Sequence, residues 1–83
     1  MSLDPAILAA ASSALRGYAL DGLDEGRQQA HNALAALILT ARSDGDGWAG
    51  TRLRRARDLI DEYATAGAGQ ADLLVGEVSE RHR

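Results

Sequence analysis

The residues best suited to chemistry are two carboxylates in the stretch SDGDGWAGT, residues 43–51. Asp44 and Asp46 have the spacing of the first two ligands of an EF-hand calcium loop. That loop needs a glutamate eleven residues after its first aspartate, and this chain has Arg55 there. Trp48 stands where the third ligand should be. The pattern therefore indicates a turn between two helices rather than a calcium site.

A basic run, RLRRAR at residues 52–57, has the side chains that bind nucleic-acid phosphates. It stands at the expected start of a helix, where the helix dipole disfavours positive charge, so a bound partner is one explanation. However, acidic residues precede and follow it, no aromatic residues are interleaved, and the chain has a net charge of -3. The run is therefore predicted to be a solvated face with local ion pairs, such as Arg54 with Asp58 and Arg57 with Asp61. Nucleic-acid binding stays as an alternative, through Arg52, Arg54, Arg55 and Arg57.

No other side chains form a recognisable catalytic or metal-binding pattern in the sequence. His31 and His82 lie far apart and lack neighbouring ligands at metal spacing. No base partner and no glycine-rich phosphate loop is visible beside the serines Ser12, Ser13, Ser43 and Ser79. The chain has no cysteine, which excludes disulfides and thiolate metal sites. The sequence therefore predicts a protein that is not an enzyme and that holds no cofactor or metal ion.

Two amphipathic helices are predicted to position these residues. Small and apolar residues recur at intervals of three and four from Pro5 to about Arg42, and Asp4 is a natural N-cap before Pro5. A second amphipathic run begins near Thr51. Glycines interrupt the first run, so a kink or break at residues 22–26 stays open as an alternative. We expect a single domain, residues 1–83, with helices at about 5–42 and 51–79 and a turn at 43–50.

The expected fold class is an all-α antiparallel hairpin whose glycines lie at helix contacts. Folding the chain back at residues 46–47 would set Gly26 opposite Gly67, where the two backbones could approach closely. Large apolar side chains are few, with one Trp, two Tyr and no Phe, so a lone hairpin would bury too little surface. Two hairpins are therefore predicted to pair into a four-helix bundle, as a homodimer or as a heterodimer with a similar hairpin. The expected interface consists of Leu15, Tyr18, Leu37, Ile60, Tyr63 and Leu74.

The motif Trp48-Ala49-Gly50, in the expected bend, resembles that of the Trp-Xaa-Gly (WXG) family of small, early-secreted-antigen-like helical hairpins. The opening LDPAILAAASSALRGYA is similar in style to that family's first helix. The resemblance implies a non-enzymatic substrate or partner of type VII secretion that acts by helix pairing, with Trp48 and Gly50 shaping the turn. One departure concerns the family's C-terminal export signal, an aromatic residue followed four residues later by an acidic one, because Tyr63 is followed at that distance by Gly67.

These interpretations imply different locations for the protein. The N-terminus lacks the positive region of a general secretory signal, and no stretch is apolar enough for a membrane span. The resemblance implies secretion by a signal-peptide-independent route, and otherwise a cytoplasmic location is expected. The alternative function is an intracellular helical adaptor or antitoxin-like regulatory subunit that binds another protein. We expect the indole of Trp48 to pack over the end of the hairpin or in the bundle interface, whereas an exposed indole would favour the adaptor.

Overall fold

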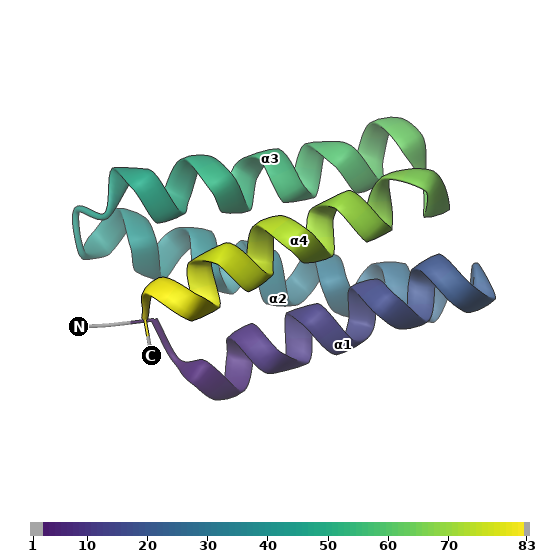
Figure 1. Cartoon of the computed structure of the whole chain (residues 1–83), viewed down its shortest axis with the longest axis horizontal. Coiled ribbons are helices and arrows are strands. Elements are labelled where there is room, and N and C mark those ends of the chain that lie inside the picture. The colour runs from purple at the N-terminus through teal and green to yellow at the C-terminus, as the bar shows by residue number, and fades with distance from the viewer. Residues whose placement is uncertain (1–2, 83) are drawn as a thin grey trace.

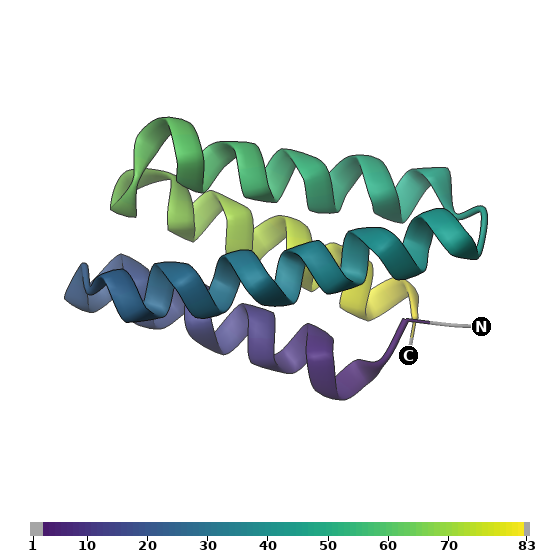
Figure 2. The same cartoon turned by 180° about the vertical axis from the view of Figure 1, so that it is seen from behind.

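The structure, a computed structural model, describes residues 3–82, and this part of the chain forms four helices. They are α1 (Pro5–Asp21), α2 (Asp24–Ser43), α3 (Gly47–Tyr63) and α4 (Thr65–Arg81). The helices run alternately up and down, each packs against the next, and α4 packs back against α1 (Figure 1). The view from behind shows α2 lying between α1 and α3 (Figure 2). The prediction of an all-α fold is confirmed, and the four-helix bundle forms within one chain.

The predicted continuous helix over residues 5–42 is wrong, because the chain breaks at Gly22. Gly22 adopts φ 66°, a left-handed conformation that ends α1, and its N–H donates to the carbonyl of Tyr18 at 3.0 Å. The break lies in the region where the sequence leaves a break open. A Cβ atom at Gly26, in the first turn of α2, would lie 3.4 Å from the backbone nitrogen of Tyr18. That distance is an ordinary van der Waals contact, so α2 packs closely on the end of α1 but leaves room for a Cβ atom there.

The predicted second helix over residues 51–79 is also wrong, because it starts too late and divides in two. Asp46 caps α3, so that α3 begins at Gly47 inside the predicted turn at 43–50. At its other end α3 is joined to α4 by Ala64 alone. Ala64 has φ 53° and ψ -131°, and it is the one non-glycine residue with positive φ in the described chain. Residues with a Cβ atom rarely adopt this backbone conformation, so an alanine in the sequence gives no indication of a turn here.

The close backbone approach expected at Gly67 is present, but its partner is different. A Cβ atom at residue 67 would lie 2.7 Å from the carbonyl carbon of Leu59, so only glycine fits between α3 and α4 here. The predicted pairing of Gly26 with Gly67 is wrong, because each glycine contacts the helix that precedes its own. The chain turns at Gly22 and Ala64 as well as at the predicted bend, so that α1 also packs on α2 and α3 on α4, while the α2–α3 and α1–α4 pairings of a simple hairpin are kept.

The core runs along the middle of the bundle and draws on all four helices. Every buried side chain in the described residues is apolar. Fully buried alanines, such as Ala30 on α2 and Ala56 on α3, let the helices approach each other between the larger residues. The largest fully buried side chains are Leu3, Leu8, Leu15, Leu34, Leu37, Leu53, Ile60, Val75 and Val78. One chain therefore supplies the core that the sequence assigns to a pair of hairpins.

Candidate functional site

The predicted interface residues occupy three different environments. Four of them are buried in the core of the chain: Leu15, Tyr18, Leu37 and Ile60. Leu74 is partly buried against that core, and Tyr63 is 56% exposed. The prediction that the first four residues bind a second hairpin is wrong for the closed bundle, because the four helices of one chain already cover them. A partner of the closed bundle would therefore contact other side chains.

Trp48 and Gly50 lie in the first turn of α3, which corrects their prediction as a turn motif between helices. Gly50 is buried, and a Cβ atom there would lie 3.9 Å from the Cβ atom of Ala41 at the end of α2. The indole of Trp48 is partly buried against the apolar core. The prediction that Trp48 packs over the end of the helices is confirmed.

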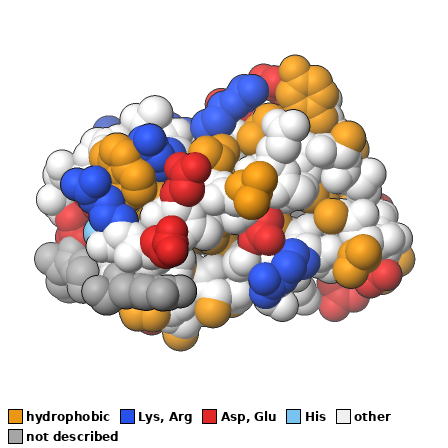
Figure 3. Space-filling view, in the orientation of Figure 1, with side chains coloured by type: hydrophobic (Ala, Val, Ile, Leu, Met, Phe, Trp, Pro, Cys, Tyr) orange, Lys and Arg blue, Asp and Glu red, His pale blue; other side chains and the backbone are white. Residues whose placement is uncertain are grey.

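Two arginines cover the ring of Trp48. The guanidinium carbon of Arg52 lies 4.1 Å from the ring centroid, and that of Arg81, at the end of α4, lies 4.7 Å from it. Both distances allow a cation–π interaction. Arg52 also donates from Nε to Oε2 of Glu77 at 3.2 Å, which links α3 to α4. Basic and hydrophobic side chains consequently lie side by side at this end of the molecule (Figure 3).

Asp46, in the turn between α2 and α3, contacts the end of α4. Its Oδ1 atom accepts a hydrogen bond from the N–H of Ala49 at 3.0 Å, and its Oδ2 atom lies 3.0 Å from Nε2 of His82. The hydrogen bond from Ala49 is the main cause that lowers the pKa of Asp46; burial opposes it to a lesser degree, and the contact with His82 lowers the pKa further. The carboxylate that the sequence offers as a calcium ligand is thus the N-cap of α3.

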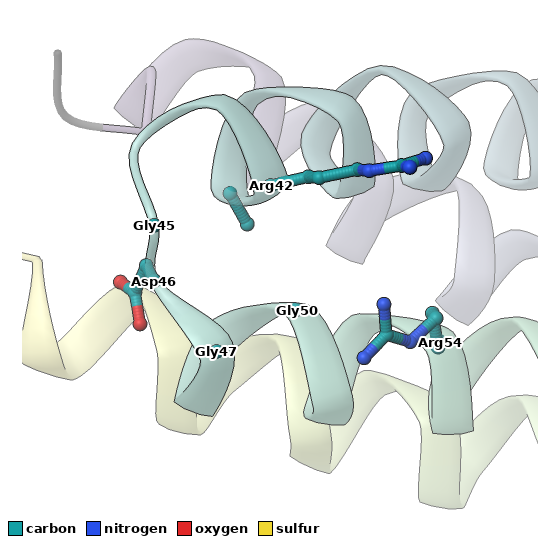
Figure 4. A pocket seen from close by; sticks show the side chains of 7 residues that line it. Arg42, Gly45, Asp46, Gly47, Gly50 and Arg54 are labelled. Carbon is teal, nitrogen blue, oxygen red and sulfur yellow. The ribbon is translucent and has the colours of Figure 1, made fainter.

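A hollow of about 230 Å³ lies beside this turn, between the end of α2 and the start of α3. Arg42 and Arg54 flank it from the two helices, while the carboxylate of Asp46 lies at the turn itself (Figure 4). Neither arginine is part of an ion pair within the described residues. Because Asp46 already accepts from an N–H group of the first turn of α3, the helix start is capped by the chain itself.

The arginine run on α3 forms ion pairs, but with partners other than the predicted ones. Nη1 of Arg55 lies 3.9 Å from Oε2 of Glu62, and Nε of Arg57 lies 3.9 Å from Oδ1 of Asp58. These pairs are long and exposed, so each adds little to stability. Two predicted pairs do not form among the described residues and are wrong: Arg54 with Asp58, and Arg57 with Asp61.

Asp61 instead links α3 to α2. Its Oδ1 atom lies 3.2 Å from Nη2 of Arg27 and 3.1 Å from Nε2 of His31. The sequence spacing of His31 does not support a metal site, and the structure places this residue in an exposed contact between two helices. The sequence analysis did not pair these residues, although a fold-back at residues 46–47 sets Asp61 opposite Asn32, beside His31.

Residues of α1 and α4 together form an outer surface of the bundle, which we call the α1–α4 face. Leu73 is 71% exposed at its centre. That leucine is one of the residues that line a shallow hollow of about 510 Å³. Ser12 on α1 donates a hydrogen bond to Asp72 on α4, which holds the two helices together there. The face consists of Ser12 and Arg16 from α1 and of Asp72, Leu73, Gly76, Glu77 and Glu80 from α4.

The hydrophobic periodicity of α4 explains why Leu73 points outward. Ala71 and Val75 are fully buried, and Leu73 is two residues from each, about 200° around the helix. The predicted interface includes its neighbour Leu74, which lies on the apolar stripe of the helix, but does not include Leu73. The signal that could have found it is a leucine outside the apolar stripe, among acidic residues. Figure 3 shows acidic and hydrophobic side chains interspersed on this side of the molecule.

Comparison of the chain with protein-family models, with curated proteins and with solved structures finds no match. None of the helices in the described part of the chain combines the length and the apolar character that crossing a bilayer requires.

Proposed function

We propose that the protein is a non-enzymatic helical adaptor that binds another protein through the α1–α4 face. The observation that carries this proposal is the exposure of Leu73, 71%, in the middle of an acidic surface. The core is complete without it, because one chain buries its own apolar stripes. An isolated exposed leucine is common on protein surfaces, but here it lies in a hollow rimmed by charges of one prevailing sign.

The charges on the face define the chemistry of the partner. Three carboxylates, those of Asp72, Glu77 and Glu80, line the hollow together with one arginine, Arg16, and Glu77 is already paired with Arg52. Asp72 accepts from a neutral serine, which leaves its charge uncompensated, and Glu80 forms no ion pair within the described residues. A basic amphipathic helix would place an apolar side chain on Leu73 and its basic side chains against the carboxylates. We therefore propose such a helix, supplied by another protein, as the ligand.

A pair of synthetic helices tests this proposal. One has a leucine stripe flanked by lysines, and the other has the same stripe flanked by glutamates. The lysine peptide should bind, with resonance shifts in an NMR spectrum of the protein concentrated on α1 and α4. Its affinity should fall as salt is added, because charges on the rim are screened. Equal binding of both peptides, or shifts centred on α2 and α3, would contradict the assignment.

Two leucine variants provide the matched control. Leu73→Ser should weaken binding of the lysine peptide by about tenfold, less than the full burial energy of a leucine implies. Leu39→Ser on α2 removes a leucine of similar exposure, 64%, outside the α1–α4 face and should leave binding unchanged. If both substitutions weaken binding equally, the peptide recognises exposed leucines in general and the proposed face is not specific.

The motif Trp48-Ala49-Gly50 supports a second candidate function, that of a substrate or partner of type VII secretion that pairs with itself or with a similar protein. Its presence in the first turn of a helix is compatible with a role in packing. A tagged protein produced in its native organism should then accumulate in the culture medium, and Trp48→Ala should reduce that accumulation. Retention of the tagged protein in the cells under conditions of active export would count against this candidate.

A further inference from the structure

The three junctions between helices are built in different ways. At the first, Gly22 ends α1 with φ 66° and its N–H bonds to the Tyr18 carbonyl. At the second, Gly45 takes φ 70° and Asp46 caps the next helix. At the third, Ala64 takes φ 53° and ψ -131° as the sole link between α3 and α4. Two junctions therefore use glycine where the backbone needs it, and the third uses alanine.

The backbone at Ala64 is strained, and the helix ends that it joins lack side-chain caps. An L-residue with a Cβ atom is disfavoured at positive φ, which is why such positions are usually glycine. No side chain caps the start of α4, and the hydrogen bond at this junction is the one from the N–H of Gly67 to the carbonyl of Ala64 at 3.1 Å. The closed bundle thus keeps a tight turn that its own local sequence disfavours.

A helical conformation at Ala64 would remove both defects. It would join α3 and α4 into one helix over residues 47–81, in which the N–H groups of residues 64–67 bond to the carbonyls of residues 60–63. No proline lies in this segment, and alanine is the residue with the highest helix propensity. The joined helix would carry α4 away from its own α1 and α3 and expose the buried side chains of both parts.

We propose that a second copy of this chain covers these exposed surfaces, so that two molecules exchange α4 through a hinge at Ala64. Each α4 then packs on α1 and α3 of the other copy and buries the same residues as in the closed form, among them Ala68, Ala71 and Val75. The exchange reproduces the existing helix contacts and relieves the strained turn, and short strained hinges favour such exchange. The proposal does not depend on the proposed adaptor function.

Concentration and a hinge variant test the exchange. The protein is unfolded and refolded at millimolar concentration, then examined by size exclusion with light scattering and by small-angle X-ray scattering. A dimer is expected that contains helices of about 50 Å, longer than the 33 Å extent of the closed chain. Ala64→Gly relieves the strain of the closed turn and disfavours the joined helix, so it should raise the dimer dissociation constant at least about tenfold. Ala10→Gly, an exposed position inside α1, makes the same chemical change away from the hinge and should leave the constant unchanged.

Fluorescence distinguishes exchange of α4 from simple association, because Trp48 is the only tryptophan and the chain has no cysteine. One chain carries Trp48→Phe and a bimane label on Arg81→Cys, and the other is unlabelled with Trp48 in place. Arg81 lies over the ring of Trp48 in the closed form, so tryptophan quenching in the mixed dimer requires α4 of the labelled chain to pack on the other chain. A protein that stays monomeric after refolding at millimolar concentration, a mixed dimer without quenching, or an Ala64→Gly variant that dimerises as wild type does would each overturn the proposal.

Discussion

The carboxylate of Asp46 lies 3.0 Å from the imidazole of His82, which joins the turn before α3 to the end of α4. The same carboxylate caps α3 through the N–H of Ala49. Replacing Asp46 with alanine removes both contacts and should lower the free energy of unfolding by about 1 kcal/mol, mainly through loss of the cap. Asn retains a capping oxygen, so Asp46→Asn should cost less. Urea unfolding followed by circular dichroism measures both, and equal stability of Asp46→Ala and wild type would contradict the assigned role.

The charge of Asp46 makes the stability difference between wild type and these variants depend on pH. Its pKa is lowered in the folded protein, chiefly by the hydrogen bond from Ala49. The ionised carboxylate therefore stabilises the folded state above the ordinary aspartate pKa of about 3.9, and this contribution disappears as the pH falls below that value through the lowered pKa. The difference in stability between wild type and Asp46→Asn should accordingly be full near neutral pH and shrink in acid. A difference that grows in acid would show that the carboxylate is not stabilised by folding.

Gly67 and Gly69 form a matched pair two residues apart on α4. Gly67→Ala places a Cβ atom 2.7 Å from the carbonyl carbon of Leu59, so the helices must separate, and we expect a loss of roughly 1 to 3 kcal/mol. Gly69 has open space around its Cα, and Gly69→Ala should stabilise the helix by up to about 1 kcal/mol. Thermal unfolding of both variants checks this, and a stabilised Gly67→Ala would mean that α3 and α4 do not approach as closely as described.

Leu37 and Leu39 show the difference between the two sides of α2. Leu37 is 1% exposed and Leu39 is 64% exposed. Leu37→Asp would bury a carboxylate without a partner and should unfold the protein. Leu39→Asp should keep the stability within about 0.5 kcal/mol of wild type, as surface substitutions usually do. Far-ultraviolet circular dichroism distinguishes them at once, and a folded Leu37→Asp variant would contradict the core assignment.

The arginines over Trp48 should be visible in quenching experiments. With Arg52 and Arg81 on its ring, the tryptophan has positive charge beside it, so the anion iodide should quench its fluorescence more efficiently than the cation caesium. Arg81→Ala should reduce this preference, because one of the two charges is lost. Arg55→Ala, which changes an arginine elsewhere on α3, should leave it unchanged. Equal quenching by the two ions in wild type would contradict the described contacts.

The sequence predicted the helical class, the start of α1 and a turn within residues 43–50, because these depend on local chemistry; residues 44–46 form that turn, and residues 47–50 belong to α3. Asp4 accepts from the N–H of Ala6, as an N-cap before a proline should. Gly22 also has a local signature, although the sequence left the break there as an alternative. The packing of Trp48 was predictable too, since a large indole is unfavourable in water.

Ala64 shows why the remainder could not be predicted from the sequence. Its conformation contradicts local preference and is held by the packing of α4 against α1 and α3, which no local pattern reports. Missing this turn and the break at Gly22 left two long helices in place of four short ones, and a lone hairpin of two helices cannot enclose the core that four helices enclose. The candidate site was not predicted because Leu73 stands outside the apolar stripe, and the hollow beside it depends on how α1 and α4 pack side by side, which no local pattern reports.

The two ends of the described chain lie at the same end of the bundle, because an even number of helices runs alternately up and down (Figure 1). A force that pulls these ends apart would therefore peel α1 and α4 from each other one turn at a time, rather than shear their whole contact at once. The domain should consequently yield at low force, whatever its thermodynamic stability, since forced rupture depends on the barrier along the pulling direction. Pulled from positions at opposite ends of α2, the same fold should resist more strongly.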